Sequence, residues 1–92
     1  MTKHSLFALG QVVSTRHALA FAEKEKIDLM ALLIRHQQGD WGDVCEEDRE
    51  SNEAALAMQS RITSNYRFAE DNIWIITEAD RSVTTILLPS DY

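Results

Sequence analysis

The sequence predicts an α+β protein, with about three N-terminal helices packed on one face of a C-terminal antiparallel β-meander of three to four strands. Apolar residues recur with a helical period in the first 60 residues. From Arg61 the period changes to two, and β-branched and aromatic residues accumulate. With 92 residues, 45% hydrophobic and 26% charged, the chain has the size and composition of a single domain, residues 1–92.

Two helices are expected before residue 40. Ser14 and Thr15 are N-cap residue types, and the following RHALAFAEKEK has the composition and closing lysines of a short helix. Asp28 can cap a second helix, LMALLIRHQQ, which Gly39 can end in the left-handed conformation. One face of that second helix collects Leu29, Leu32, Leu33 and His36.

A third helix is expected over about residues 44–59, because Asp43 and Glu46 have the spacing of a capping box. Its inward positions are unusually polar, and Asn52 among them needs hydrogen-bond partners if it is buried. These positions are Asp48, Asn52, Ala55, Leu56 and Gln59.

Three antiparallel strands are expected in RITSNYRF, IWIITE and VTTILLP. Pairing Phe68 with Ile73 and Glu78 with Val83 divides their residues between two faces, and a one-residue slip would exchange these faces. The face that the helices should cover carries Ile62, Ser64, Tyr66, Phe68, Ile73, Ile75, Thr77, Thr84, Ile86 and Leu88. The opposite or second face carries Trp74, Ile76, Val83 and Leu87, an apolar set that predicts a homodimer or a protein partner there.

The net charge of −6 is concentrated in one place. Seven acidic residues and one arginine in residues 40–53, the acidic segment, account for the whole excess: Asp40, Asp43, Glu46, Glu47, Asp48, Glu50 and Glu53 against Arg49. The segment is either a solvated helix face or a docking surface for a basic partner. It disfavours direct nucleic-acid binding, because phosphate contacts need lysine and arginine.

Other patterns limit the class of protein. The sequence has no apolar run long enough for a membrane span and no signal peptide, so a cytoplasmic protein is expected. The single cysteine, Cys45, excludes an intramolecular disulfide and is interpreted as a small apolar residue. The spacing of the acidic residues lacks the pattern of a calcium loop, and no glycine-rich phosphate loop is present. We therefore expect no metal and no cofactor.

Polar side chains converge at one end of the expected sheet. Ser64, Thr77 and Thr84 form a row of hydroxyls, beside which His36, the GDWGD loop and the turn after Glu78 can lie. This row is either a hydrogen-bonded sheet end with a core histidine or the floor of a pocket. For an enzyme, the candidate catalytic residues are His36, Glu78, Arg81, Thr84 and Thr85, with His36 as general acid or base and Arg81 holding an anionic phosphate. For a binding protein, the candidate contacts are Asp40, Trp41, Asp43, Glu46, Glu47, Asp48 and Trp74.

Four segments resemble a family of small bacterial proteins encoded on plasmids and other mobile elements: LGQVVST, RHQQGDWGD, EEDRESN and WIITEADRSVTTILLP. The resemblance covers nearly the whole chain and implies a plasmid-related setting, but it implies no activity. His17 stands where we expect a small residue, so it is given no role. The order of helices before antiparallel strands is more loosely similar to the metal-independent ribonucleases of the barnase, RelE and colicin type.

Three hypotheses follow. The leading one is a small non-enzymatic, protein-binding accessory factor of a mobile element that inhibits a host defence or nucleic-acid-processing system. The second is a metal-independent, ribonuclease-like enzyme with its site at the 77–85 hairpin. The third is a homodimeric structural or regulatory protein that pairs through Trp74, Ile76, Val83 and Leu87.

Overall fold

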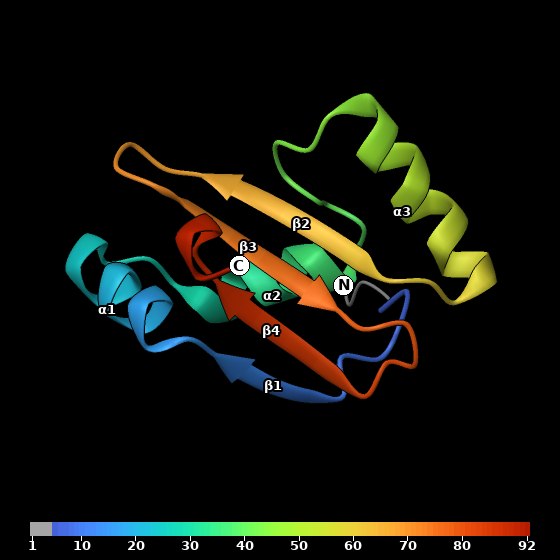
Figure 1. The fold of residues 1–92 in the computed structure, drawn as a ribbon, viewed down its shortest axis with the longest axis horizontal. Coiled ribbons are helices and arrows are strands. Elements are labelled where there is room, and N and C mark those ends of the chain that lie inside the picture. The colour runs from blue at the N-terminus through green and yellow to red at the C-terminus, as the bar shows by residue number, and fades with distance from the viewer. Residues whose placement is uncertain (1–4) are drawn as a thin grey trace, which may run out of the picture.

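The computed structural model describes residues 5–92, which form an α+β arrangement of three helices and a four-stranded sheet (Figure 1). The helical first half and the strand-rich second half confirm the α+β class. In chain order the elements are β1 (Gln11–Ser14), α1 (Arg16–Glu25), α2 (Leu29–Gln37), α3 (Glu46–Met58), β2 (Ile62–Arg67), β3 (Asn72–Thr77), β4 (Val83–Leu87) and the 3-10 turn η1 (Pro89–Asp91).

The sheet is mixed, so the expectation of a purely antiparallel meander was wrong. Its strand order is β1-β4-β3-β2. The β2–β3 and β3–β4 pairs are antiparallel as expected, but β1 precedes the helices and pairs parallel to β4. Four residues are too few for a period of two to be recognised, and a parallel partner is reached only through a long crossover. No local signal could therefore identify β1.

The strand registers keep the expected faces. The β3–β4 pairing is the expected one, with the Glu78 backbone N–H donating to the Val83 carbonyl at 3.0 Å. In the β2–β3 pair, Tyr66 instead of Phe68 lies opposite Ile73, because the hairpin turn is centred one residue earlier in the chain than expected. This shift of register is by two residues, and an even shift leaves every side chain on its own face.

The first two helices begin at their expected caps. The Thr15 hydroxyl accepts a hydrogen bond from the Ala18 backbone N–H at the start of α1. The Asp28 carboxylate accepts from two backbone N–H groups in the first turn of α2. Gly39 follows α2 with a φ of +89°, the left-handed conformation expected of it.

The start of α3 differs from the expected one. Cys45 is the N-cap residue and makes no capping hydrogen bond with its side chain. The capping box of Asp43 and Glu46 is absent, because the Asp43 carboxylate accepts a hydrogen bond from the Arg67 backbone N–H instead. Cys45, interpreted from the sequence as a small apolar residue, is exposed.

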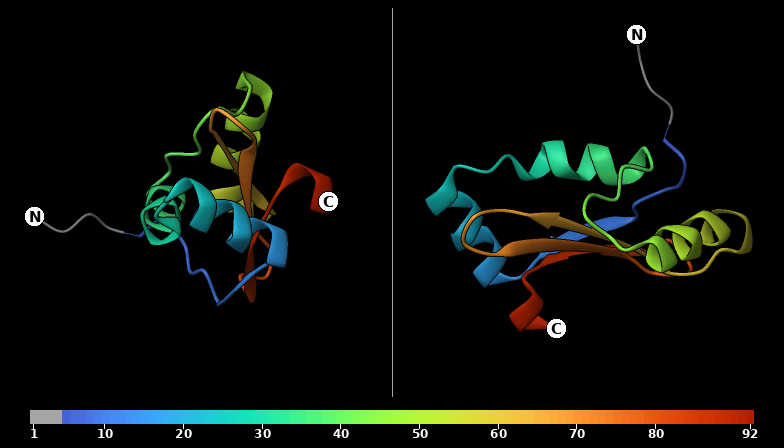
Figure 2. Two further views of the ribbon diagram at one scale, coloured as in Figure 1. Left: turned by 90° about the vertical axis from the view of Figure 1, so that its left-hand side faces the viewer. Right: turned by 90° about the horizontal axis from the view of Figure 1, so that it is seen from above.

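The three helices do not share one face of the sheet. Figure 2 shows α2 over one face, α1 across one end, and α3 beside β2. The main core lies under α1 and α2 and comprises Ala18, Leu32, Leu33, Tyr66, Ile73, Ile75, Ile86 and Leu88. A smaller cluster of Trp41, Ala55 and Ile62 lies where α3 meets β2. No helix within residues 5–92 has the length and hydrophobicity required to cross a membrane.

Candidate functional site

The GDWGD segment, residues 39–43, closes the outer edge of β2. The Asn65 backbone N–H donates to the Trp41 carbonyl at 3.0 Å, and the Asp43 N–H donates to the Asn65 carbonyl. Between them, Gly42 forms an isolated parallel bridge with Asn65. The Asp43 side chain then accepts from the Arg67 N–H at 3.2 Å. The loop thus acts as a short fifth strand, which protects an edge that could otherwise pair with another chain.

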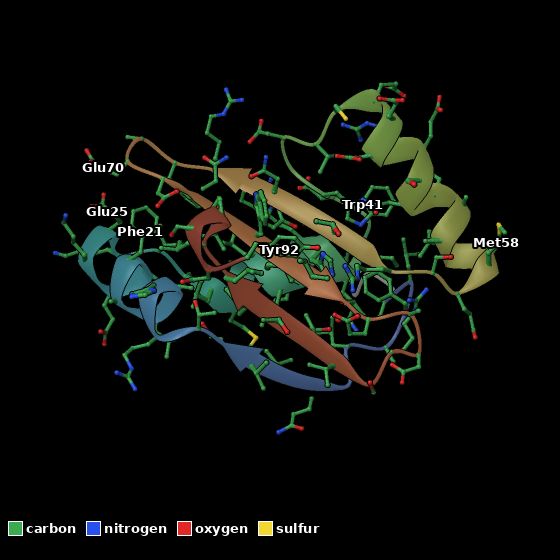
Figure 3. All side chains as sticks on the ribbon, in the orientation of Figure 1. Phe21, Glu25, Trp41, Met58, Glu70 and Tyr92 are labelled. Carbon is green, nitrogen blue, oxygen red and sulfur yellow. The ribbon has the colours of Figure 1, made fainter. Side chains whose placement is uncertain are left out.

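Three residues of this loop were candidate partner contacts, and the structure places Trp41 and Asp40 in different surroundings. Trp41 is 1% exposed and packs between α3 and β2 (Figure 3), so it is a core residue and not a surface contact. Asp40 is exposed and forms an ion pair with Arg35 at 2.7 Å. The hydrogen bond from Arg35 lowers the pKa of Asp40. The ion pair holds the loop against the end of α2.

Asn52 closes the next position along the same edge. Its amide nitrogen donates to the Thr63 carbonyl at 2.8 Å, and its amide oxygen accepts from the Thr63 N–H at 3.2 Å. The side chain is 3% exposed and takes the place of a peptide group on a neighbouring strand. Of the positions of α3 expected to point inward, Asn52 and Ala55 are buried, whereas Asp48 and Gln59 are exposed. The buried polar residue Asn52 serves hydrogen bonding to the sheet edge.

Replacing this amide should destabilise the fold. We expect Asn52→Ala to lower the free energy of unfolding by about 2 kcal/mol, because the N–H and C=O of Thr63 both lose their partner. Urea denaturation measures the change. Ser51→Ala, at an exposed position of the same helix, is the matched control and should change stability little. Equal stabilities for the two variants would contradict this role of Asn52.

His36 lies in a buried chain of hydrogen bonds that includes the expected hydroxyl row. Its Nδ1 is 2.5 Å from the Ser64 hydroxyl, and its Nε2 is 2.9 Å from the Thr77 hydroxyl. The Thr77 hydroxyl lies 2.8 Å from that of Thr84, which donates to the Leu9 carbonyl at 2.7 Å. His36 and the three hydroxyl residues are each 0% exposed.

The directions of these hydrogen bonds place a proton on Nε2 of His36. The Leu9 carbonyl can only accept, so Thr84 donates to it and must accept from Thr77. Thr77 then accepts from the Nε2–H of His36. Burial lowers the pKa of His36 to about 4, so the ring is neutral near pH 7 and its Nδ1 accepts from the Ser64 hydroxyl.

The remaining candidate catalytic residues lie apart from this chain. Arg81 donates to the carbonyls of Ser60 at 2.6 Å and Ala55 at 3.0 Å, so its guanidinium binds the C-terminal end of α3. The Phe7 ring lies against both residues, with its centroid 5.2 Å from that of His36 and 5.6 Å from the Arg81 guanidinium carbon.

Glu78 and Thr85 complete the candidate catalytic set, and neither joins His36. Glu78 forms an ion pair with Arg61 at 3.3 Å, and Thr85 belongs to the second face. The structure therefore brings together His36 and Thr84 through Thr77, in a place closed to solvent. It does not gather the five candidate residues around one accessible point.

A groove of about 490 Å³ opens on the second face, between the start of α3 and the C-terminal end of the chain. Its lining comprises Asp43, Val44, Cys45, Asp48, Arg61, Thr63, Asn65, Trp74, Ile76 and Tyr92. Of the candidate partner contacts, Asp43, Asp48 and Trp74 meet here. Glu46 and Glu47 are exposed in the first turn of α3, next to the groove lining.

The C-terminal turn places Tyr92 over β3 (Figure 3), where its ring meets Trp74 edge to face with centroids 5.7 Å apart. Asp91 holds this turn in place. Its carboxylate accepts from the Thr15 hydroxyl at 2.7 Å and from the Leu88 N–H at 3.1 Å, and it pairs with His17. His17, which was given no role, therefore helps to anchor one wall of the groove.

The second face is less open than the sequence suggests. Ile76 and Leu87 are each 6% exposed within a single chain, while Trp74 and Val83 are half-buried. The C-terminal turn lies on this side of the sheet, away from α2 (Figure 2). Pairing of two copies through this face stays a prediction.

Sequence reasoning missed several groove residues as site residues. The period of two assigns Arg61, Thr63 and Asn65 to the second face, but it does not indicate which polar residues of that face line a groove. No local pattern marks Tyr92, because its position depends on the anchoring of Asp91. Cys45 was interpreted as a small apolar residue without a role in a site, although it lines the groove.

These features define a small α+β protein with a closed polar core cluster and an open groove on the second face. In comparisons with protein-family models, curated proteins and solved structures, no match to this chain was found.

Proposed function

We propose that this chain is a non-enzymatic binding protein that docks a protein partner on the groove of the second face. The observation that carries this proposal is that the groove joins the acidic segment to the apolar second face. Asp43 and Asp48 come from the former, and Trp74 and Ile76 from the latter. A concave surface with aromatic anchors and a charged rim is the usual composition of a protein-recognition site.

The His36 cluster supports a role without catalysis. His36 has both ring nitrogens bound inside the core, and Arg81 is committed to backbone carbonyls. Neither group is placed to exchange protons or hold phosphate at the surface. Their hydrogen bonds join α2 and the C-terminal end of α3 to the sheet whose second face carries the groove.

The resemblance to plasmid-related proteins suggests the setting. In this proposal the protein is an accessory factor of a mobile element, and it inhibits a host defence or nucleic-acid-processing protein by occupying its surface. Proteins that hold nucleic acid do so with basic surfaces, to which an acidic segment is complementary. Charge complementarity would also speed the encounter with such a partner.

Affinity capture from a bacterial host, followed by crosslinking and mass spectrometry, tests this function. We expect Trp74→Ala to reduce recovery of the partner by about tenfold or more, because aromatic anchors carry much of the binding energy at such sites. Tyr92→Ala, at a 73% exposed position, removes a groove wall without touching the core and should reduce recovery too.

The matched control is Ile34→Ala, which changes an apolar residue of α2 that is 48% exposed and lies outside the groove. It should leave recovery unchanged. Circular dichroism checks that each variant is folded. The proposal fails if the groove variants recover the same partner as the unmodified protein, or if only the protein itself is recovered.

A further inference from the structure

The groove contains a buried acceptor that lacks a donor. The amide oxygen of Asn65 is inaccessible to water and has no hydrogen-bond partner among residues 5–92. Asn65 lines the groove, and its backbone groups are held by Trp41 and Asp43. An acceptor left without a donor in a buried position is costly. Because Asn65 lines the groove, a rotation of its amide about χ2 would bring the oxygen to the groove surface, where the N–H donor of a ligand would relieve this cost.

The charges around the groove favour a cation. Asp48 is exposed at the rim, and two further carboxylates lie beside it in the first turn of α3. The positive charge of Arg61 is already paired with a carboxylate, because its guanidinium forms an ion pair with Glu78 at 3.3 Å. The guanidinium also donates to the Tyr92 hydroxyl at 3.3 Å. The carboxylates of the first turn repel an anion that could otherwise bind at the start of α3.

The aromatic wall favours a planar cation. Trp74 and Tyr92 stand edge to face, so the two rings present π surfaces in different directions along the groove. A guanidinium group stacks on such rings and carries five N–H donors in a rigid fork. A lysine ammonium is a compact, strongly hydrated charge and suits a mixed aromatic and amide wall less well.

We infer that the groove binds an arginine side chain of the partner, with the guanidinium donating to the Asn65 amide oxygen and the Asp48 carboxylate and stacking on the Trp74–Tyr92 wall. The inference rests on the proposed function and specifies the chemistry of the partner. The partner then presents a basic segment with an arginine at its centre and apolar neighbours that contact Ile76.

A titration with blocked peptides tests the inference on the whole chain. The probe is the tripeptide Leu-Arg-Leu with acetylated and amidated ends, and the matched probe has citrulline, an uncharged analogue, in place of arginine. We expect the arginine probe to shift the NMR signals of the Trp74 indole and the Asn65 side-chain amide in a saturable way. The citrulline probe should bind about tenfold more weakly, the usual loss when a charge-assisted hydrogen bond becomes a neutral one.

Two variants locate the charge that is recognised. Asp48→Asn should weaken binding of the arginine probe about threefold, as expected for an exposed charge pair. Glu50→Gln removes an acidic residue of the same helix that lies outside the groove lining, so it should not change the affinity. Both positions are exposed, so both variants should fold.

Four outcomes would overturn the inference. Equal binding of the two probes would leave recognition to the apolar side chains alone. Preference for a phosphoserine peptide would assign the groove to anions. Concentration-dependent shifts without any probe would assign it to a second copy of the chain. No binding of the arginine probe, with partner capture still dependent on Trp74, would reject arginine recognition while leaving the proposed function in place.

Discussion

Acidification from pH 7 to pH 4 should lower the free energy of unfolding by about 3 kcal/mol through His36 alone. Burial lowers the pKa of His36 to about 4, against about 6.5 in the unfolded chain. Between these values the unfolded state binds a proton that the folded state does not. The contribution of His36 to the free energy of unfolding is therefore fully present above pH 6.5. It falls as the pH drops toward 4 and stays constant below that pH.

Urea denaturation at several pH values between 7.5 and 4 measures this loss. The control is His36→Gln, which keeps a neutral polar side chain that does not titrate, so its stability should change much less over this interval. The carboxylate of Asp91, whose pKa the hydrogen bonds from His17 and Thr15 lower to about 2, contributes in a separate interval below pH 4. Parallel pH profiles for the unmodified protein and the variant would reject the buried, neutral state of His36.

Of the two Gly→Ala substitutions in the GDWGD loop, Gly42→Ala should lower the stability of the fold more. Gly42 has a φ of +73°, and a β-carbon there would lie 2.3 Å from the Asn65 carbonyl oxygen and 2.7 Å from Cδ1 of Tyr66. Neither neighbour can easily move, because one is strand backbone and the other belongs to a buried ring. We expect a loss of about 3 kcal/mol or more, from backbone strain and steric overlap together.

Gly39→Ala separates these two contributions. Gly39 has a comparable φ of +89°, but the nearest atom to its added β-carbon is the end of the exposed Leu6 side chain at 3.0 Å. Gly39→Ala therefore has only the cost of holding an alanine in the left-handed backbone conformation, which is about 1 to 2 kcal/mol. Thermal or urea denaturation of both variants gives the comparison. Equal losses would mean that the loop moves away from β2 without cost, and that it does not close the edge as described.

The sequence predicted which residues of the His36 cluster lie close together, but it could not predict whether the cluster is accessible for a reaction. The sequence predicted that Ser64, Thr77 and Thr84 share a face near His36, and the structure places them in one hydrogen-bonded chain. The period of two is enough to predict this, because it assigns side chains to faces. Whether the cluster is open or buried depends on what packs over it, and no local pattern carries that information.

By itself, the sequence determined the parts of the structure that local interactions specify: the caps of α1 and α2, the three strands of the second half, and the residues on each face of the sheet. Only the tertiary structure decided the parallel pairing of β1, the position of α3 beside β2, and the groove that Tyr92 completes. The physical reason is the separation along the sequence over which each interaction acts. Capping and alternating burial act between residues a few positions apart, whereas the partners of Asn52, Arg81 and Asp91 are distant backbone and side-chain groups that only the folded chain brings within reach.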